Sequence, residues 1–448
     1  MKTYTTVRNK RIIYSLMWSI YVIIFLTCNS LPTFGKDEDV LKLNLSDCIK
    51  MALDTNPSII KARAGIDVAK ANRTQALSGF YPVIKMNSQY NRTNASSTSI
   101  SGTGGTVVST PDSQSSYTNF TLTQRIFDSF KTWKNYKYSD AQLENAEYAL
   151  QESCNNLALN VTQYYFNVIS AANLVKLNET LVQQSINHLE QTEANYRAGI
   201  APKADTYSAQ VNFTQAKVNL LDAQNNLRIK MANLKNLIGL KRNIDAEVIE
   251  EHFELNYKPE LQESITNALE KRPELKEMMA QIQAQTIQID ILTLNVMPQL
   301  TVDVGLNLDA ARDPSRTNNY YTVQANFTLP LFDGFSSSSK IDAAKASKTS
   351  LEAGKLDTEK SISLEVETSY YNLETAFAKI ELTTQQVEEA NKNLQVAEGR
   401  YKAGVSPFQE LLDAQVTFSK SMTELIVAKY NYQIALFTFK KAIGDELL

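Results

Sequence analysis

The chain has 448 residues and a formal net charge of −3, and this balance gives no reason to expect a nucleic-acid partner. Only 14 glycines and 11 prolines interrupt it, which favours long, continuous helices. Its length is typical of two or three domains, but a duplication within it favours one architecture built from two halves.

Residues 1–35 have the pattern of a signal peptide. Basic residues precede an apolar run from Ile12 to Leu26, and small residues follow it, which favours cleavage near Gly35. A second interpretation makes Cys28 a lipidated N-terminal residue, although Thr27 before it is bulkier than that processing usually accepts. A third interpretation is a retained anchor helix, for which the apolar run is short.

The first structural repeat is expected over residues 36–239. From Pro82 onward the apolar residues follow a period of two, which indicates a strand. Residues 128–198 contain neither glycine nor proline, and their apolar positions recur at spacings of four and three, as in a coiled coil. A helix of this length would be about 100 Å long. The expected elements are helices 57–79, 128–198 and 204–238 and strands 82–91 and 117–127.

Residues 240–260 form a charged, irregular linker, after which the same series of elements restarts in a second repeat over residues 261–448. The pair Phe127-Asp128, for example, returns as Phe332-Asp333, 205 residues later. The expected elements are strands 299–309 and 320–330 and helices 273–296, 335–403 and 408–443.

Both repeats contain the same turn. It reads YRAGIAP at residues 196–202 and YKAGVSP at residues 401–407, and the separation of 205 residues is kept as far as Gly239 and Gly444. A glycine that ends one helix, followed by a proline that begins the next, indicates a sharp reversal of the chain. The sequence therefore predicts one long helical hairpin in each repeat.

The strands have the length and alternation of transmembrane β-strands. Val304 and Phe327 are expected to face lipid, whereas Asn307 and Gln324 are expected to face a lumen. A sheet packed on a soluble core is the alternative, but the adjoining long helices leave no amphipathic helix to cover it. Four strands cannot close a barrel, and open edges do not occur in lipid. Two chains would give eight strands and a filled interior, and three would give twelve and room for a channel.

The sequence offers no catalytic constellation, so we expect neither an enzyme nor a cofactor. Its two histidines, His188 and His252, are expected at the surface, and Cys48 and Cys154 are expected as lone buried thiols. No cysteine and histidine cluster has the spacing of a metal site, and no glycine-rich phosphate loop is present.

Taken together, the signal pattern, Asn56-Pro57, Pro82, Phe127-Asp128, the two turns and the duplication resemble the TolC family of outer-membrane efflux channels. The resemblance covers essentially everything after the signal. It implies a mainly helical fold with a transmembrane β-barrel: a homotrimer with a twelve-stranded barrel in outer-membrane lipid, continued by a periplasmic α-barrel. It also implies a passive exit duct for tripartite efflux or type I secretion, opened by a periplasmic adaptor (membrane fusion) protein and an inner-membrane pump.

The resemblance places the resting closure of the channel at the ends of the helical hairpins. Tyr401 matches the family's tyrosine before the second turn, and Asp205 matches the aspartate that this tyrosine contacts. Ser406 stands where the family pattern can have an arginine, so one link of the gate is missing or replaced. Lys203 and Arg197 are nearby cations that offer a substitute.

Glu410 and Asp413 match paired acidic positions that line the periplasmic constriction of the family, and their spacing of three puts them on one helix face. An ordinary solvated acidic face is the alternative. The residues expected to meet the adaptor at the two tips are Ala198, Gly199, Ile200, Ala403, Gly404 and Val405.

Two other classes of protein compete with an exit duct. A structural periplasmic coiled-coil spacer or adaptor without a pore accounts for the helices but not for four amphipathic strands. An autonomous porin accounts for the strands but does not have the long helices. The cargo stays open between small molecules and proteins.

Overall fold

The computed structural model describes residues 41–93, 113–241, 243–250, 259–311 and 319–445. The signal-peptide region, Cys28 and His252 lie outside these ranges, as does most of the longer polar loop. The chain divides into two units, and the described part of the smaller one comprises Leu41–Lys42 and Asn243–Glu247. In it, the backbone N–H of Leu41 donates to the carbonyl of Asp245 at 2.9 Å. This bond belongs to a small sheet of β1 (Leu41–Leu43) and β4 (Ala246–Val248).

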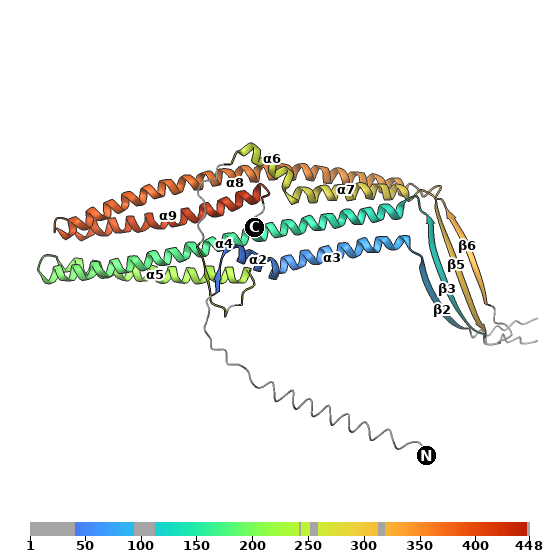
Figure 1. Ribbon diagram of the computed structural model, residues 1–448, viewed down its shortest axis with the longest axis horizontal. Coiled ribbons are helices and arrows are strands. Elements are labelled where there is room, and N and C mark those ends of the chain that lie inside the picture. The colour runs from blue at the N-terminus through green and yellow to red at the C-terminus, as the bar shows by residue number, and fades with distance from the viewer. Residues whose placement is uncertain (1–40, 94–112, 242, 251–258, 312–318, 446–448) are drawn as a thin grey trace, which may run out of the picture. The chain divides into compact units, whose positions relative to one another are not determined.

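The larger unit, Leu43–Arg242 with Val248–Leu448, contains both halves of the duplication. Its two longest helices, α4 (Lys131–Arg197) and α8 (Ser336–Lys402), have 67 residues each, which corresponds to about 100 Å. Two return helices, α5 (Lys203–Leu237) and α9 (Phe408–Ala442), have 35 residues each. The prediction of long helical hairpins is confirmed (Figure 1). None of the helices in the described ranges is long and apolar enough to cross a membrane.

Shorter helices complete each half. They are α2 (Leu45–Thr55), α3 (Pro57–Leu77), α6 (Leu261–Lys271) and α7 (Pro273–Leu294), with a single 3₁₀ turn, η1 (Ser78–Phe80), after α3. Both α3 and α5 pack along α4 (Figure 1). The end of α5 meets the junction of α2 and α3, where the hydroxyl of Thr55, the last residue of α2, donates to the carbonyl of Ile238 at 3.0 Å. One long helix is therefore covered by two shorter helices that follow one another along it.

The four long strands form one antiparallel sheet in the order β2-β3-β5-β6, at the end of the helices (Figure 1). They are β2 (Val83–Thr93), β3 (Ser113–Phe127), β5 (Gln299–Ala311) and β6 (Asn319–Thr328). Val304 lies opposite Leu122 on one side and Val323 on the other. Asp303 lies opposite Thr123 and Gln324. The register therefore collects apolar residues on one face of the sheet and polar residues on the other.

The link from strand to long helix is built the same way in both halves. Asp128 accepts a hydrogen bond from the backbone N–H of Thr132 at 2.8 Å, and Asp333 accepts one from Ser337 at 2.9 Å. These carboxylates satisfy donors that the first turn of a helix leaves free. The duplicated Phe-Asp pair thus marks the point where each strand ends and the long helix begins.

Candidate functional site: the hairpin tips and the constriction

The two hairpin tips present apolar residues to solvent. Gly199 and Gly404 both have φ of +72°, in the left-handed region that glycine adopts without strain. The residues after them close the turns, because Ile200 donates its N–H to Asn195 at 2.9 Å and Val405 to Arg400 at 3.1 Å. Ile200 is 70% exposed and Val405 is 68% exposed. All six residues expected to meet an adaptor are exposed.

Tyr401 lies inside the second hairpin. It is 6% exposed, and its ring packs on Phe408 with 5.3 Å between ring centroids. Its hydroxyl lies 3.2 Å from the hydroxyl of Thr192 on α4. Asp205 is half-buried in the first turn of α5, and within the described residues no hydrogen bond joins it to Tyr401. In the single chain Tyr401 therefore contacts Thr192, and the contact with Asp205 that the resemblance implies stays a prediction.

The acidic pair Glu410 and Asp413 occupies two different environments. Glu410 Oε1 lies 3.3 Å from a guanidinium nitrogen of Arg400, and the Arg400 side chain is 53% exposed. Asp413 is exposed and accepts a hydrogen bond from the amide of Gln409 at 2.8 Å. Arg400 is not among the residues expected from the sequence. Aligning the two repeats singles it out, because Asn195 stands at the corresponding place in the first.

The two cations that the sequence offered as substitutes for the missing arginine face elsewhere. Lys203 Nζ lies over the ring of Tyr207, 5.5 Å from its centroid, and Arg197 pairs with Glu193 of its own helix at 3.4 Å. Ser406 is half-buried, and within the described part of the chain its hydroxyl has no hydrogen-bond partner.

His188 is half-buried on α4, and is thus less accessible than the surface position that the sequence led us to expect. Burial lowers the pKa of its imidazole, and Lys402 lowers the pKa further, against the opposite effect of Glu398. Cys48 is buried and Cys154 is half-buried, and neither forms a disulfide within the described residues. Among the residues that the structure describes, no group of three or more His, Cys, Asp and Glu side chains is arranged to hold a metal ion.

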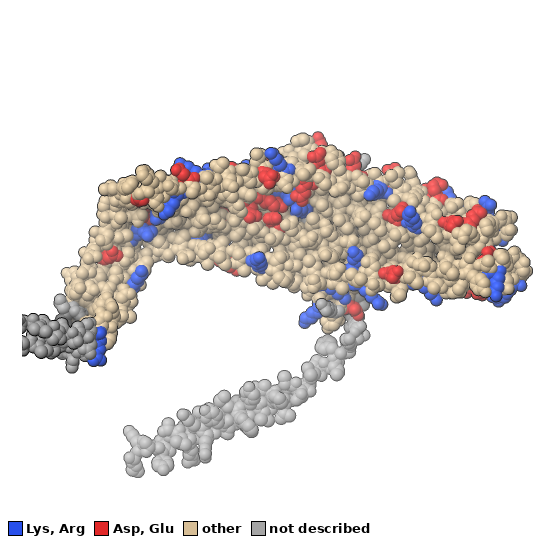
Figure 2. Space-filling model, turned by 180° about the vertical axis from the view of Figure 1, so that it is seen from behind, with Lys and Arg blue, Asp and Glu red and all other residues tan. Residues whose placement is uncertain are grey.

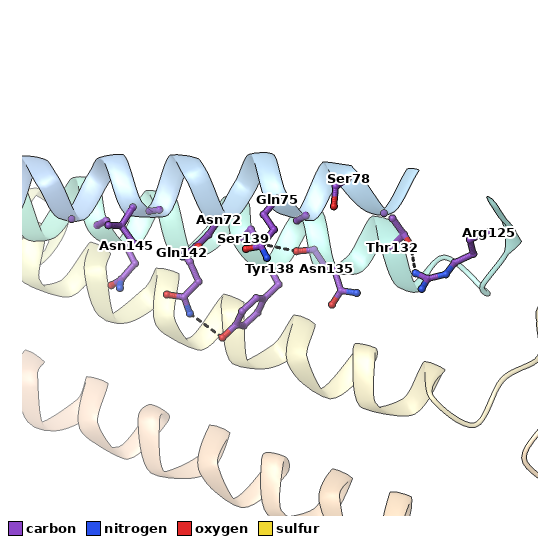
Figure 3. A pocket seen from close by; sticks show the side chains of 16 residues that line it. Asn72, Gln75, Ser78, Arg125, Thr132, Asn135, Tyr138, Ser139, Gln142 and Asn145 are labelled. Atoms are coloured by element: carbon purple, nitrogen blue, oxygen red, sulfur yellow. Dashed lines mark hydrogen bonds between the residues drawn. The ribbon is translucent and has the colours of Figure 1, made fainter. Parts of the chain in front are cut away.

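A polar groove of about 780 Å³ lies between α3 and α4, near the sheet (Figure 3). Its lining includes several amide side chains, among them Asn72 and Gln75 of α3 and Asn135 and Gln142 of α4. Elsewhere on the helices, acidic and basic residues are interspersed on the face that Figure 2 shows.

Comparison with known proteins identifies the family. The model of the family described as outer membrane efflux protein matches residues 48–240 and 264–445. TolC of Salmonella enteritidis is 23% identical over 434 residues, covering 94% of this chain and 85% of the relative. The alkaline protease secretion protein AprF of Pseudomonas aeruginosa is 22% identical over 414 residues, covering 89% of this chain and 84% of the relative.

Solved structures show the same fold. The Campylobacter jejuni CmeC channel matches with a TM-score of 0.76 at 16% identity, covering 89% of this chain and 85% of that one. The Vibrio cholerae outer membrane protein VceC matches with a TM-score of 0.75 at 17% identity, covering 90% and 97%. With its family model spread over both repeats, the chain belongs to the outer membrane efflux protein family and is a TolC-type efflux or secretion channel of the outer membrane, a transporter rather than an enzyme.

Proposed function

We propose that three copies of this chain close into a single duct that crosses the outer membrane and continues through the periplasm. One observation carries the proposal: the sheet and the helices leave their open edges on the same two sides. The strand order is β2-β3-β5-β6, and the helices joined to these strands pack in the matching order α3, α4, α7 and α8. One edge is therefore α3 with β2, and the other is α8 with β6.

Closure with further copies satisfies both edges. Unpaired strand edges do not persist in lipid, so β2 and β6 need partners. These two strands run in opposite directions, because each neighbouring pair in the sheet is antiparallel. The β6 of one copy therefore fits antiparallel beside the β2 of the next. Two copies would give an eight-stranded barrel, and side chains would fill its interior. Three copies and twelve strands therefore suit a channel.

The chemistry of the two faces fits this arrangement. The polar face carries a hydrogen-bonded set of side chains, in which Asp303 accepts from Asn326 at 2.7 Å and from Thr123. We assign this face to the lumen and the apolar face, with Val304 and Phe327, to lipid. The two edge helices also expose apolar residues, among them Ile60 and Val68 on α3 and Leu356 and Leu364 on α8.

The hairpin tips complete the proposed duct. The exposed apolar turns suit docking of a periplasmic adaptor that links the channel to an inner-membrane pump. The family resemblance assigns Tyr401 and Asp205 to the gate and Glu410 and Asp413 to the constriction, and we retain both assignments as proposals. Relatives are named for protease secretion and for toxin and drug export, so both cargo classes fit. A spacer without a pore does not fit the family.

Crosslinking between strand edges tests the closure. Cysteines at Met86 on β2 and Val323 on β6 should give trimers with a flexible thiol crosslinker, because the two strands meet only between copies. The matched control places cysteines at Met86 and Phe120, which are cross-strand partners within one chain, and should give crosslinked monomers. A folded sample that light scattering shows to be monomeric, with no crosslink between chains in the first variant, would refute the proposal.

A further inference from the structure

The two hairpin tips share a backbone but differ in side chains at corresponding positions 205 residues apart. Arg400 in the second hairpin corresponds to Asn195 in the first, and Glu410 corresponds to Asp205. The acidic position is therefore present in both tips, but only the second tip has a basic residue at the matching place on the preceding helix. A feature confined to one copy of a duplication points to a role that the shared fold does not require.

Arg400 stands in the last turn of α8, and Glu410 in the first turn of α9. Their ion pair at 3.3 Å therefore spans the turn and joins the two helices of the hairpin. One helical turn further on, Asp413 has only the neutral amide of Gln409 as a side-chain partner among the described residues. Of the two carboxylates assigned to the constriction, one is thus compensated by a cation and the other is not.

Resting on the duct proposed above, we infer that Arg400 sets the charge of the periplasmic constriction by neutralising Glu410, which leaves Asp413 as the carboxylate that attracts cations. In a trimer the three residue types form neighbouring rings of three guanidinium groups and six carboxylates. The net charge of the constriction is then negative and only half of what Glu410 and Asp413 alone would supply. Arg400 is a charge-setting residue, because the carboxylates themselves meet the ions.

The exposure of the pair decides between an electrostatic and a mechanical role. Ion pairs that are this accessible to water contribute little to stability, so this contact does little to hold the two helices of the hairpin together. Passing ions, in contrast, come within a few ångströms of these groups, where salt screens poorly because the Debye length is about 8 Å. Rings of carboxylates favour cations in a pore, and a ring of cations beside them opposes this. Changing Arg400 should therefore alter selectivity and leave assembly intact.

Planar-bilayer recordings of the full-length trimer test the inference. The reversal potential in a potassium chloride gradient measures selectivity, and a trivalent metal cation added on the periplasmic side measures block. Arg400→Gln should raise cation selectivity and tighten the block by roughly tenfold, equivalent to about 1.4 kcal/mol shared among three freed carboxylates. Glu410→Gln should do the opposite, because it leaves Arg400 uncompensated beside Asp413. The double variant removes one charge of each sign and should return both readouts close to those of the parent channel.

Lys392→Gln is the matched control, because Lys392 lies two turns earlier on α8 in an exposed pair with Glu388 at 2.9 Å. It should change neither readout. The inference is overturned if Arg400→Gln behaves like the parent channel, if the double variant behaves like Arg400→Gln, or if the control shifts selectivity as much as Arg400→Gln does. A parent trimer that never conducts would overturn the duct itself, and this result is distinct from the other three.

Discussion

Replacing Val304 by arginine tests which face of the sheet meets the outer membrane. Val304 lies near the middle of β5, one of the two inner strands, and is 41% exposed in the single chain. Its cross-strand neighbours, Leu122 and Val323, are both apolar. The substitution therefore puts a charge where the register leaves no polar partner and where the proposed barrel faces lipid.

The expected cost is large enough to prevent assembly. Arginine on the lipid face of a barrel costs about 2–4 kcal/mol at the middle of the bilayer, so three copies in a trimer add up to about 6–12 kcal/mol. A folded protein is typically stable by about 5–15 kcal/mol, and the loss is of the same size. We expect Val304→Arg to give little trimer in the outer membrane and to shift urea-induced unfolding in lipid vesicles to lower denaturant.

Gln324→Arg is the matched control, because Gln324 lies on the opposite face, directly across from Asp303. There the new guanidinium would face water and gain a nearby carboxylate, so trimer yield and unfolding should stay close to those of the parent protein. The assignment of the faces is wrong if Gln324→Arg impairs assembly as much as Val304→Arg, or if both are tolerated.

Two further predictions concern the helices. Gly239→Ala should destabilise the protein more than Gly199→Ala in chemical denaturation. Both glycines have positive φ, near +70°, which costs an alanine about 1–2 kcal/mol, but only at Gly239 would the new Cβ clash, against Thr55. Equal losses of stability in the two variants would contradict the packing. Because the pKa of His188 is lowered, the folded protein favours the neutral imidazole. The contribution of His188 to stability is therefore full above the unfolded pKa of 6.5, and it is lost as the pH falls from 6.5 through the folded pKa. His188→Gln should flatten this part of the profile of stability against pH, and an unchanged profile would assign the acid sensitivity to other groups.

The parts of the fold that could be predicted are those with local signals. A long helix is indicated by its own residues, through the absence of glycine and proline and the spacing of apolar residues by three and four. A strand is likewise indicated by the alternation of apolar and polar residues along it. The duplication then doubles the evidence, since α4 and α8 begin and end 205 residues apart, as do α5 and α9. For this reason a mainly helical fold with a duplicated pair of strands could be predicted from the sequence.

The parts that could not be predicted depend on contacts between distant segments. His188 is half-buried because of what packs against α4, and charges on α8 affect its pKa, which its own sequence neighbours do not reveal. The pairing of Tyr401 with Thr192 joins residues more than 200 positions apart. The ion pair of Arg400 and Glu410 depends on how far each side chain reaches across the turn.

Differences between the two repeats show where function has been added to a shared backbone. In the second tip, Phe408 gives Tyr401 a ring to pack on, whereas in the first tip the corresponding residue is Lys203 and Tyr196 is 43% exposed. The second turn is therefore anchored by a small buried core, which Ala209 of the first hairpin joins, whereas the first turn leaves an aromatic residue accessible. Because the main-chain turns are alike, unequal behaviour of the two hairpins in a symmetric trimer has to come from these side chains. The second tip is the better candidate for a gate, and the first is the better candidate for contact with another chain.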